Sequence, residues 1–129
     1  MKPHSKMTEL EELFWLFNSR YFHFGRRKLE SLLGVEWRDL DRHNPPLMGK
    51  NQSYRTLSSP LPRPWPDKYM IQINKKFKTC WRVWAGTLLH EMVHFKLVET
   101  DKSRARCGSR LFQKEMKRLA NVGAFAGIW

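Results

Sequence analysis

Two histidines four residues apart, with a glutamate directly after the first, form the group best suited to chemistry in this sequence. They are His90, Glu91 and His94. On an α-helix, residues four apart lie on one face, so both imidazoles can reach the same metal ion with Glu91 close beside it. Neutral imidazoles are good zinc ligands, and a catalytic zinc site keeps one coordination position open for water. The spacing therefore predicts Zn²⁺ on His90 and His94, with Glu91 as the general base of a hydrolase.

This metal site requires a helix, and the surrounding residues predict one over roughly residues 79–98. Its apolar side chains recur at three- and four-residue steps: Trp81, Trp84, Leu88, Met92 and Phe95. That period is typical of a helix with one face packed against a core, and Thr79 can cap its start. Either histidine alone would be read as an ordinary surface or hydrogen-bonded core residue. The pair with Glu91 between them favours a site.

Two further helices are expected, one on each side of the metal helix in sequence. The capping box Thr8-Glu-Leu-Glu11 begins an amphipathic helix over roughly residues 8–22. A last amphipathic helix covers roughly residues 109–122, and Gly123 stands where a C-terminal cap belongs.

Three strands are expected between the first helix and the metal helix. Val35 and Trp37 alternate with polar residues, a second strand is plausible near residues 53–57, and residues 69–74 alternate just before the metal helix. The intervening residues 44–66 are rich in Pro and Asn. Together these elements predict one α+β domain over residues 1–129, a size sufficient for a hydrophobic core.

The chain is strongly basic, with a formal net charge of +12 from 24 Lys and Arg against 12 acidic residues. Such an excess predicts attraction to nucleic acid, without sequence specificity; a solvated, solubilising surface is the equal alternative. The basic residues cluster on both sides of the metal helix. The candidates for DNA contact are Lys75, Lys76, Lys78, Arg104, Arg106, Arg110 and Lys114.

The sequence carries no apolar run near the roughly 18 residues of a membrane span and no apolar signal-peptide core. We therefore expect a cytoplasmic protein that does not bind membranes. Its two cysteines, Cys80 and Cys107, are too few for a disulfide scaffold and are expected to be thiols available to a metal. Cys80 lies about 15 Å from His90 along the helix axis, too far to share the ion.

Four stretches of the sequence carry a shared pattern: residues 13–22, 35–37, 87–97 and the last helix, which includes Phe-Gln-Lys-Glu-Met-Lys-Arg-Leu. With these stretches, nearly the whole chain resembles the SprT-like, or Spartan-type, zinc metallopeptidases. The resemblance implies a zincin-like fold, zinc on His90 and His94, and Glu91 as catalytic base. It also implies a protein or peptide substrate lying along residues 69–74 and, in Spartan-like members, DNA-dependent cleavage of DNA-bound proteins.

The third metal ligand departs from the family pattern. Family members take it from a His-Gly-x-x-Phe motif, but here no histidine follows His94, and Cys107-Gly108 occupies the place, one residue further from Phe112. Cysteine is an accepted zinc ligand, so Cys107 is the expected third ligand. Glu99, Asp101 and Glu115 are the rivals, each read more simply as a solvated charge.

The sequence thus predicts a zinc-dependent endopeptidase. The main alternative is a catalytically degenerate protein that binds metal or DNA as a regulator on the same scaffold. A weaker alternative is a basic helix that only docks a protein partner. Intact Glu91 favours the enzyme, whereas the missing third histidine favours the regulator.

Overall fold

The computed structural model describes residues 7–41, 48–54, 68–97 and 109–128. It confirms a mixed α+β architecture. The elements, in chain order, are α1 (Glu9–Phe17), a π-helical turn (Asn18–Phe22), α2 (Arg26–Glu30), β1 (Leu32–Arg38), β2 (Gly49–Tyr54), β3 (Lys68–Asn74), a 3₁₀ turn (Lys75–Phe77), α3 (Trp81–Leu97) and α4 (Arg110–Asn121). Within the described ranges, none of the helices has the length and apolar character that crossing a membrane requires.

The three strands form one mixed sheet in the order β1-β3-β2. β1 runs parallel to β3, with Val35 opposite Ile71, and β2 runs antiparallel to it, with Gly49 opposite Ile73. β3 therefore has a hydrogen-bonded neighbour on each side. The second strand begins at Gly49, before the expected residues 53–57, whereas β3 nearly matches its predicted bounds.

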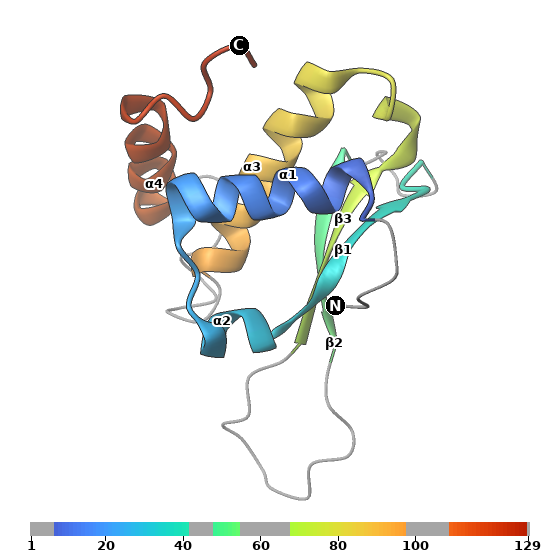
Figure 1. Ribbon diagram of the computed structural model, residues 1–129, viewed down its shortest axis with the longest axis horizontal. Coiled ribbons are helices and arrows are strands. Elements are labelled where there is room, and N and C mark those ends of the chain that lie inside the picture. The colour runs from blue at the N-terminus through green and yellow to red at the C-terminus, as the bar shows by residue number, and fades with distance from the viewer. Residues whose placement is uncertain (1–6, 42–47, 55–67, 98–108, 129) are drawn as a thin grey trace, which may run out of the picture.

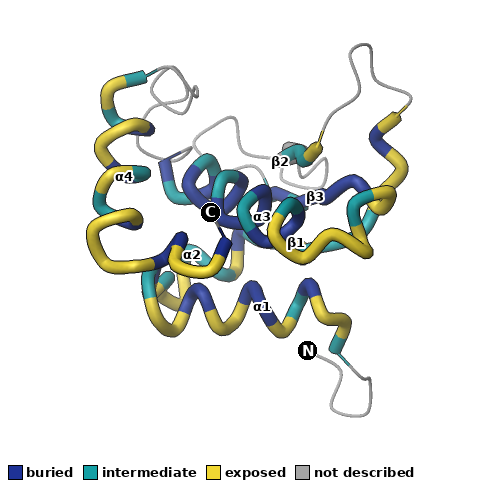
Figure 2. The backbone as a smooth tube through the Cα atoms, turned by 90° about the horizontal axis from the view of Figure 1, so that it is seen from above, coloured by how far each residue is buried: buried dark blue, intermediate teal, exposed yellow. Residues whose placement is uncertain are grey.

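α1 packs against β1, and α3 packs against β3 and β2 (Figure 1). Between them lies one apolar core, to which α1 contributes Leu10 and Phe14, β3 contributes Ile71, and α3 contributes Leu88 and Met92. Figure 2 shows buried positions recurring along one side of α1 and covering most of α3. α3 is thus the central helix, and its location holds the residues on it in fixed positions.

α1 forms as the sequence predicted. The Thr8 hydroxyl accepts a hydrogen bond from the Glu11 amide, and the Glu11 carboxylate accepts one from the Thr8 amide, which completes the capping box. The predicted continuation to residue 22 is helical but changes to a π-helical turn at Asn18, which ends at His23 with a positive φ of 57°. This turn directs the chain away from α1 toward α2.

α3 begins at Trp81, two residues later than expected, so Thr79 is not its cap. The Cys80 carbonyl accepts hydrogen bonds from the amides of Val83 and Trp84 at the helix start. Trp84 is buried as predicted, but Trp81 is 48% exposed and does not belong to the core-facing stripe. The Trp81 ring instead lies edge-to-face against that of Trp84, 5.1 Å away between centroids.

α4 lies within one residue of the predicted bounds at each end, and its C-terminal end has the predicted glycine. The Ser109 hydroxyl accepts a hydrogen bond from the Phe112 amide, and at the other end Gly123 adopts a φ of 83° while the Ala124 amide bonds to the Leu119 carbonyl. This is the Schellman arrangement, for which a glycine is suited because it adopts positive φ without steric cost. α4 packs against α3 and so brings Phe112 to the histidine pair.

Candidate metal centre

His90, Glu91 and His94 come together on α3 as the spacing predicted. One potential ligand atom from each lies within 4.8 Å of the others, so the group could hold a metal ion. The Nε2 atoms of His90 and His94 are 3.2 Å apart. Both histidines are half-buried, whereas Glu91 is only 6% exposed. The three side chains thus form a compact set at the boundary between core and solvent.

The environment of His90 favours the neutral imidazole, which is the form that binds metals. Burial, and secondarily the nearby His94, lower the pKa of His90 from 6.5 to about 4. At neutral pH the His90 ring is therefore neutral, so a metal ion need not compete with a second ring proton.

Burial shifts the pKa of Glu91 in the opposite direction from that of His90. Burial raises the pKa of its carboxyl from 4.5 to about 8. Transfer of a carboxylate from water to an apolar surrounding disfavours the charged form, because the lost hydration is not replaced. A carboxylate with a pKa near neutrality is a far better proton acceptor than an ordinary surface glutamate.

Burial of Glu91 predicts that metal-free protein loses stability as pH rises. A raised folded-state pKa means that the native state binds the proton more tightly, so stability is intact below about pH 4.5 and falls as pH approaches 8. Glu91→Gln removes this titration. In chelator, the Gln variant should match the parent near about pH 5 and exceed it by a few kcal/mol near about pH 9, from ~1.4 kcal/mol per pKa unit.

Urea unfolding of the two proteins across this pH range measures the difference. The lowered pKa of His90 costs stability in acid, but it affects both proteins equally and cancels in the comparison. A stability difference that does not change with pH would contradict an ionising, buried Glu91.

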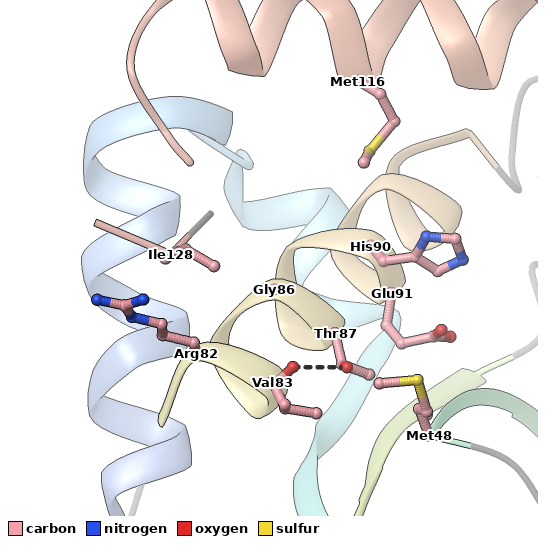
Figure 3. A pocket seen from close by; sticks show the side chains of 10 residues that line it. Met48, Arg82, Val83, Gly86, Thr87, His90, Glu91, Met116 and Ile128 are labelled. Carbon is pink, nitrogen blue, oxygen red and sulfur yellow. Dashed lines mark hydrogen bonds between the residues drawn. The ribbon is translucent and has the colours of Figure 1, made fainter. Parts of the chain in front are cut away.

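His90 and Glu91 line a cavity of about 580 Å³. Figure 3 shows it bounded by α3, by Met48 just before β2, by Met116 of α4 and by Ile128 at the C-terminal end of the described chain. The remaining lining residues are Gly49, Arg82, Val83, Gly86 and Thr87. The candidate metal site therefore faces a space large enough for several residues of another chain.

Gly49 brings β2 unusually close to Glu91. A Cβ atom at this position would lie 2.6 Å from the Thr87 Cγ2 and 3.0 Å from the Glu91 Cγ. Real Cβ atoms essentially never approach another heavy atom closer than 3.0 Å, so only glycine fits. The sequence does not single out Gly49, because a lone glycine at a strand start gives no signal of what will pack beside it.

Phe112 of α4 lies against both histidine rings. Its ring centroid is 4.8 Å from that of His90 and 4.6 Å from that of His94, and the side chain is 3% exposed. These contacts restrict rotation of the two imidazoles. The apolar period of the last helix predicted that Phe112 would be buried, but not that it would pack on the candidate ligands.

The candidates for a third ligand divide into those the structure describes and those it does not. Cys107, Glu99 and Asp101 lie outside the described residues. Cys80 is described, exposed and at the far end of α3, and it is not part of the group, as expected. Among described residues, only Glu115 remains as a rival.

Glu115 is not the solvated charge that the sequence suggested. It is 8% exposed, and it accepts hydrogen bonds from Arg118 Nε at 2.9 Å and pairs with Lys96 Nζ at 2.8 Å. Burial by itself would raise its pKa, but the bonds from Arg118 and Lys96 outweigh burial and the net pKa is lowered. This carboxylate is committed to two cations and joins α4 to the end of α3.

The predicted DNA-contacting residues fall at two places in the described structure. Lys75 and Lys76 lie in the 3₁₀ turn before α3, followed by Lys78, whereas Arg110 and Lys114 lie on α4. Figure 1 places this turn and α4 on opposite sides of α3. Lys76 also pairs with Asp41 at 3.1 Å. Arg104 and Arg106 lie outside the described residues.

Comparison with known proteins adds no assignment to this geometry. No family model matches the chain, and neither the curated proteins nor the solved structures give a match.

Proposed function

We propose that this protein is a zinc-dependent endopeptidase with a zincin-like fold, similar to the SprT-like metallopeptidases. The observation that carries the proposal is the placement of His90, Glu91 and His94 on one central helix, with the glutamate buried and the group open to a cavity. A purely structural histidine pair has no need of a buried carboxylate beside it, since that carboxylate costs stability.

The imidazole separation supports zinc in particular. Two nitrogens each 2.0–2.1 Å from a tetrahedral zinc ion would be about 3.3 Å apart. The observed separation of His90 Nε2 and His94 Nε2 is 3.2 Å, so the two rings need little movement to hold the ion. When bound, zinc would supply a Lewis acid that polarises a peptide carbonyl and acidifies water.

Glu91 supplies the proton transfers. Its carboxylate accepts a proton from the attacking water and then donates that proton to the leaving amine, so the amide bond breaks without release of a strong base. Burial supports this role, because it raises the pKa of the carboxyl in the metal-free protein and so makes the carboxylate a stronger proton acceptor than an exposed glutamate. Phe112 keeps the histidine rings in place meanwhile.

The strand that pairs with the substrate must be a different one from residues 69–74, which the resemblance implied. Residues 69–74 form β3, which already pairs with β1 on one side and β2 on the other, so no peptide can add to it. Within the described sheet, β2 pairs on one side only, and Gly49 at its start lies against Glu91. We therefore propose that the part of the substrate on one side of the scissile bond adds as a strand to β2.

The experiment that tests the function combines metal content with turnover. Purified protein should contain about one zinc per chain, and it should cleave an unfolded protein substrate only while zinc is present. Removal of the zinc with a chelator should abolish cleavage, and added zinc should restore it. Stoichiometric zinc without cleavage of any protein or peptide would favour the regulatory alternative instead.

A further prediction concerns the third ligand, which we propose to be Cys107. Two imidazoles alone leave zinc under-coordinated, and a thiolate completes an accepted catalytic set. Cys107→Ala should lose most of the zinc after dialysis, whereas Cys80→Ala, the matched control at the distant exposed thiol, should keep it. Elemental analysis measures the zinc content of both variants. Equal occupancy in the two variants would transfer the role to Glu99 or Asp101.

We propose further that the substrates are proteins associated with DNA, on the strength of the net charge of +12. Binding to DNA should be independent of sequence and should weaken as salt rises, because it releases counterions. Arg110→Glu with Lys114→Glu on α4 should reduce the affinity, as measured by fluorescence anisotropy. Absence of binding at low salt would leave the charge as a determinant of solubility alone.

A further inference from the structure

The cavity at the candidate metal centre extends along α3 to a cation. Arg82, Gly86 and His90 are spaced four residues apart, so they lie along one face of the helix, and all three line the cavity. Figure 3 shows His90 with Glu91 at one end of this row and Arg82 at the other. The space between the two ends is therefore a groove along the helix.

The lining of the groove suits an extended peptide. Gly86, at the middle of the row, has no side chain and leaves room for a main chain to lie close to α3. Its apolar walls come from four parts of the chain, namely the residue before β2, α3, α4 and the segment after α4: Met48, Val83, Met116 and Ile128. Among the lining residues that the structure describes, the acidic and basic side chains are Glu91 at one end and Arg82 at the other.

Arg82 is available to bind an anion. Its side chain is exposed, and among the described residues no carboxylate lies within ion-pair distance of it. By comparison, Arg118 and Lys96 are both held by Glu115. With no described carboxylate to hold it, the guanidinium at the end of the groove presents its donors in a planar fork that matches a carboxylate.

The distance between Arg82 and His90 determines how many peptide residues fit between them. Eight residues separate Arg82 from His90, which is about 12 Å along the helix axis. A peptide in extended conformation covers this distance in about four residues at ~3.3 Å each. A substrate side chain that reaches Arg82 therefore belongs to a residue about three to five positions from the bond that lies at His90 and Glu91.

We propose that Arg82 is a specificity-determining residue, and that the enzyme prefers peptides with an Asp or Glu about three to five residues from the scissile bond. This inference rests on the proposed endopeptidase function and adds a substrate class to it. The Arg82 guanidinium binds the substrate carboxylate, the apolar walls hold the intervening side chains, and the scissile bond is thereby placed at Glu91.

A mixture of random peptides, analysed by mass spectrometry of the products, tests the preference. The parent protein should cleave with acidic residues enriched about threefold to tenfold at one of these positions, a size expected for a partly exposed charged pair. Arg82→Glu should lose this enrichment and favour Lys or Arg there instead. Arg27→Glu on α2 makes the same charge change away from the cavity and should keep the parent preference.

Binding without turnover separates this inference from the function on which it rests. Matched peptides with Asp or Asn at the selected position are titrated onto the Glu91→Gln variant, with and without Arg82→Glu. The Asp peptide should bind about threefold to tenfold more tightly only when Arg82 is present. An acidic preference that survives Arg82→Glu, or a parent with none, overturns the inference. Absence of cleavage together with Arg82-dependent binding would overturn the proposed function alone.

Discussion

Glu91→Gln is expected to lower the proposed zinc-dependent peptide hydrolysis by about 10² to 10⁴-fold, the usual contribution of a general base, while zinc remains bound. The substitution keeps the shape of the side chain but removes its ability to accept a proton. Both imidazoles stay in place, because His90 and His94 are oriented by α3 and by Phe112 rather than by Glu91. Initial rates and zinc content, measured on the same preparation, check the two halves of this result.

His90→Ala is the matched control for this prediction. It removes a ligand instead of the base, so it should lose zinc and activity together. The contrast distinguishes a defect in proton transfer from a defect in metal binding. If the Gln variant retained most of the zinc-dependent activity, Glu91 would not be the base and the mechanism would need another proton acceptor.

Gly49→Ala is expected to reduce turnover by about 10²-fold, although the substitution adds only one methyl group. The new Cβ would meet the Thr87 Cγ2 at 2.6 Å and the Glu91 Cγ at 3.0 Å, and the Gln72 carbonyl oxygen lies 3.3 Å away. Either β2 moves away from α3 or Glu91 shifts. A displacement of about 1 Å at a catalytic group is enough for such a loss.

Adding Thr87→Ser to Gly49→Ala tests whether the clash with Thr87 causes the loss of turnover. Serine lacks the Cγ2 that the new methyl group would strike, but it keeps the hydroxyl, which donates to the Val83 carbonyl at 2.7 Å. The double variant should regain a substantial part of the turnover lost in Gly49→Ala. Zinc content should be the same in all variants. Lost zinc in Gly49→Ala, or no recovery in the double variant, would indicate general disruption rather than misplacement of Glu91.

The sequence by itself determined the local features of this protein. The capping box at Thr8 and the cap at Gly123 were predictable because they depend on residues only a few positions apart. The same holds for His90 and His94, since the helical period alone places both on one face of α3. The α+β class followed from the order of helical and alternating patterns.

Only the tertiary structure decided which segments surround that helix. It made β3 the central strand and β2 an edge, and so moved the proposed substrate edge from one to the other. It also buried Glu115 between Lys96 and Arg118, although the sequence around it reads as a solvated surface.

Three features of the site join residues from separate elements. Gly49 lies against Glu91, Phe112 packs on both histidines, and Arg82 lines a cavity that β2 and α4 help to form. Periodicity specifies which face of an element is buried, because it reflects the geometry of one helix or strand. It carries no information about the partner of that face. The partner is fixed only when the helices and the sheet pack together, and that packing decides what Glu91 can do.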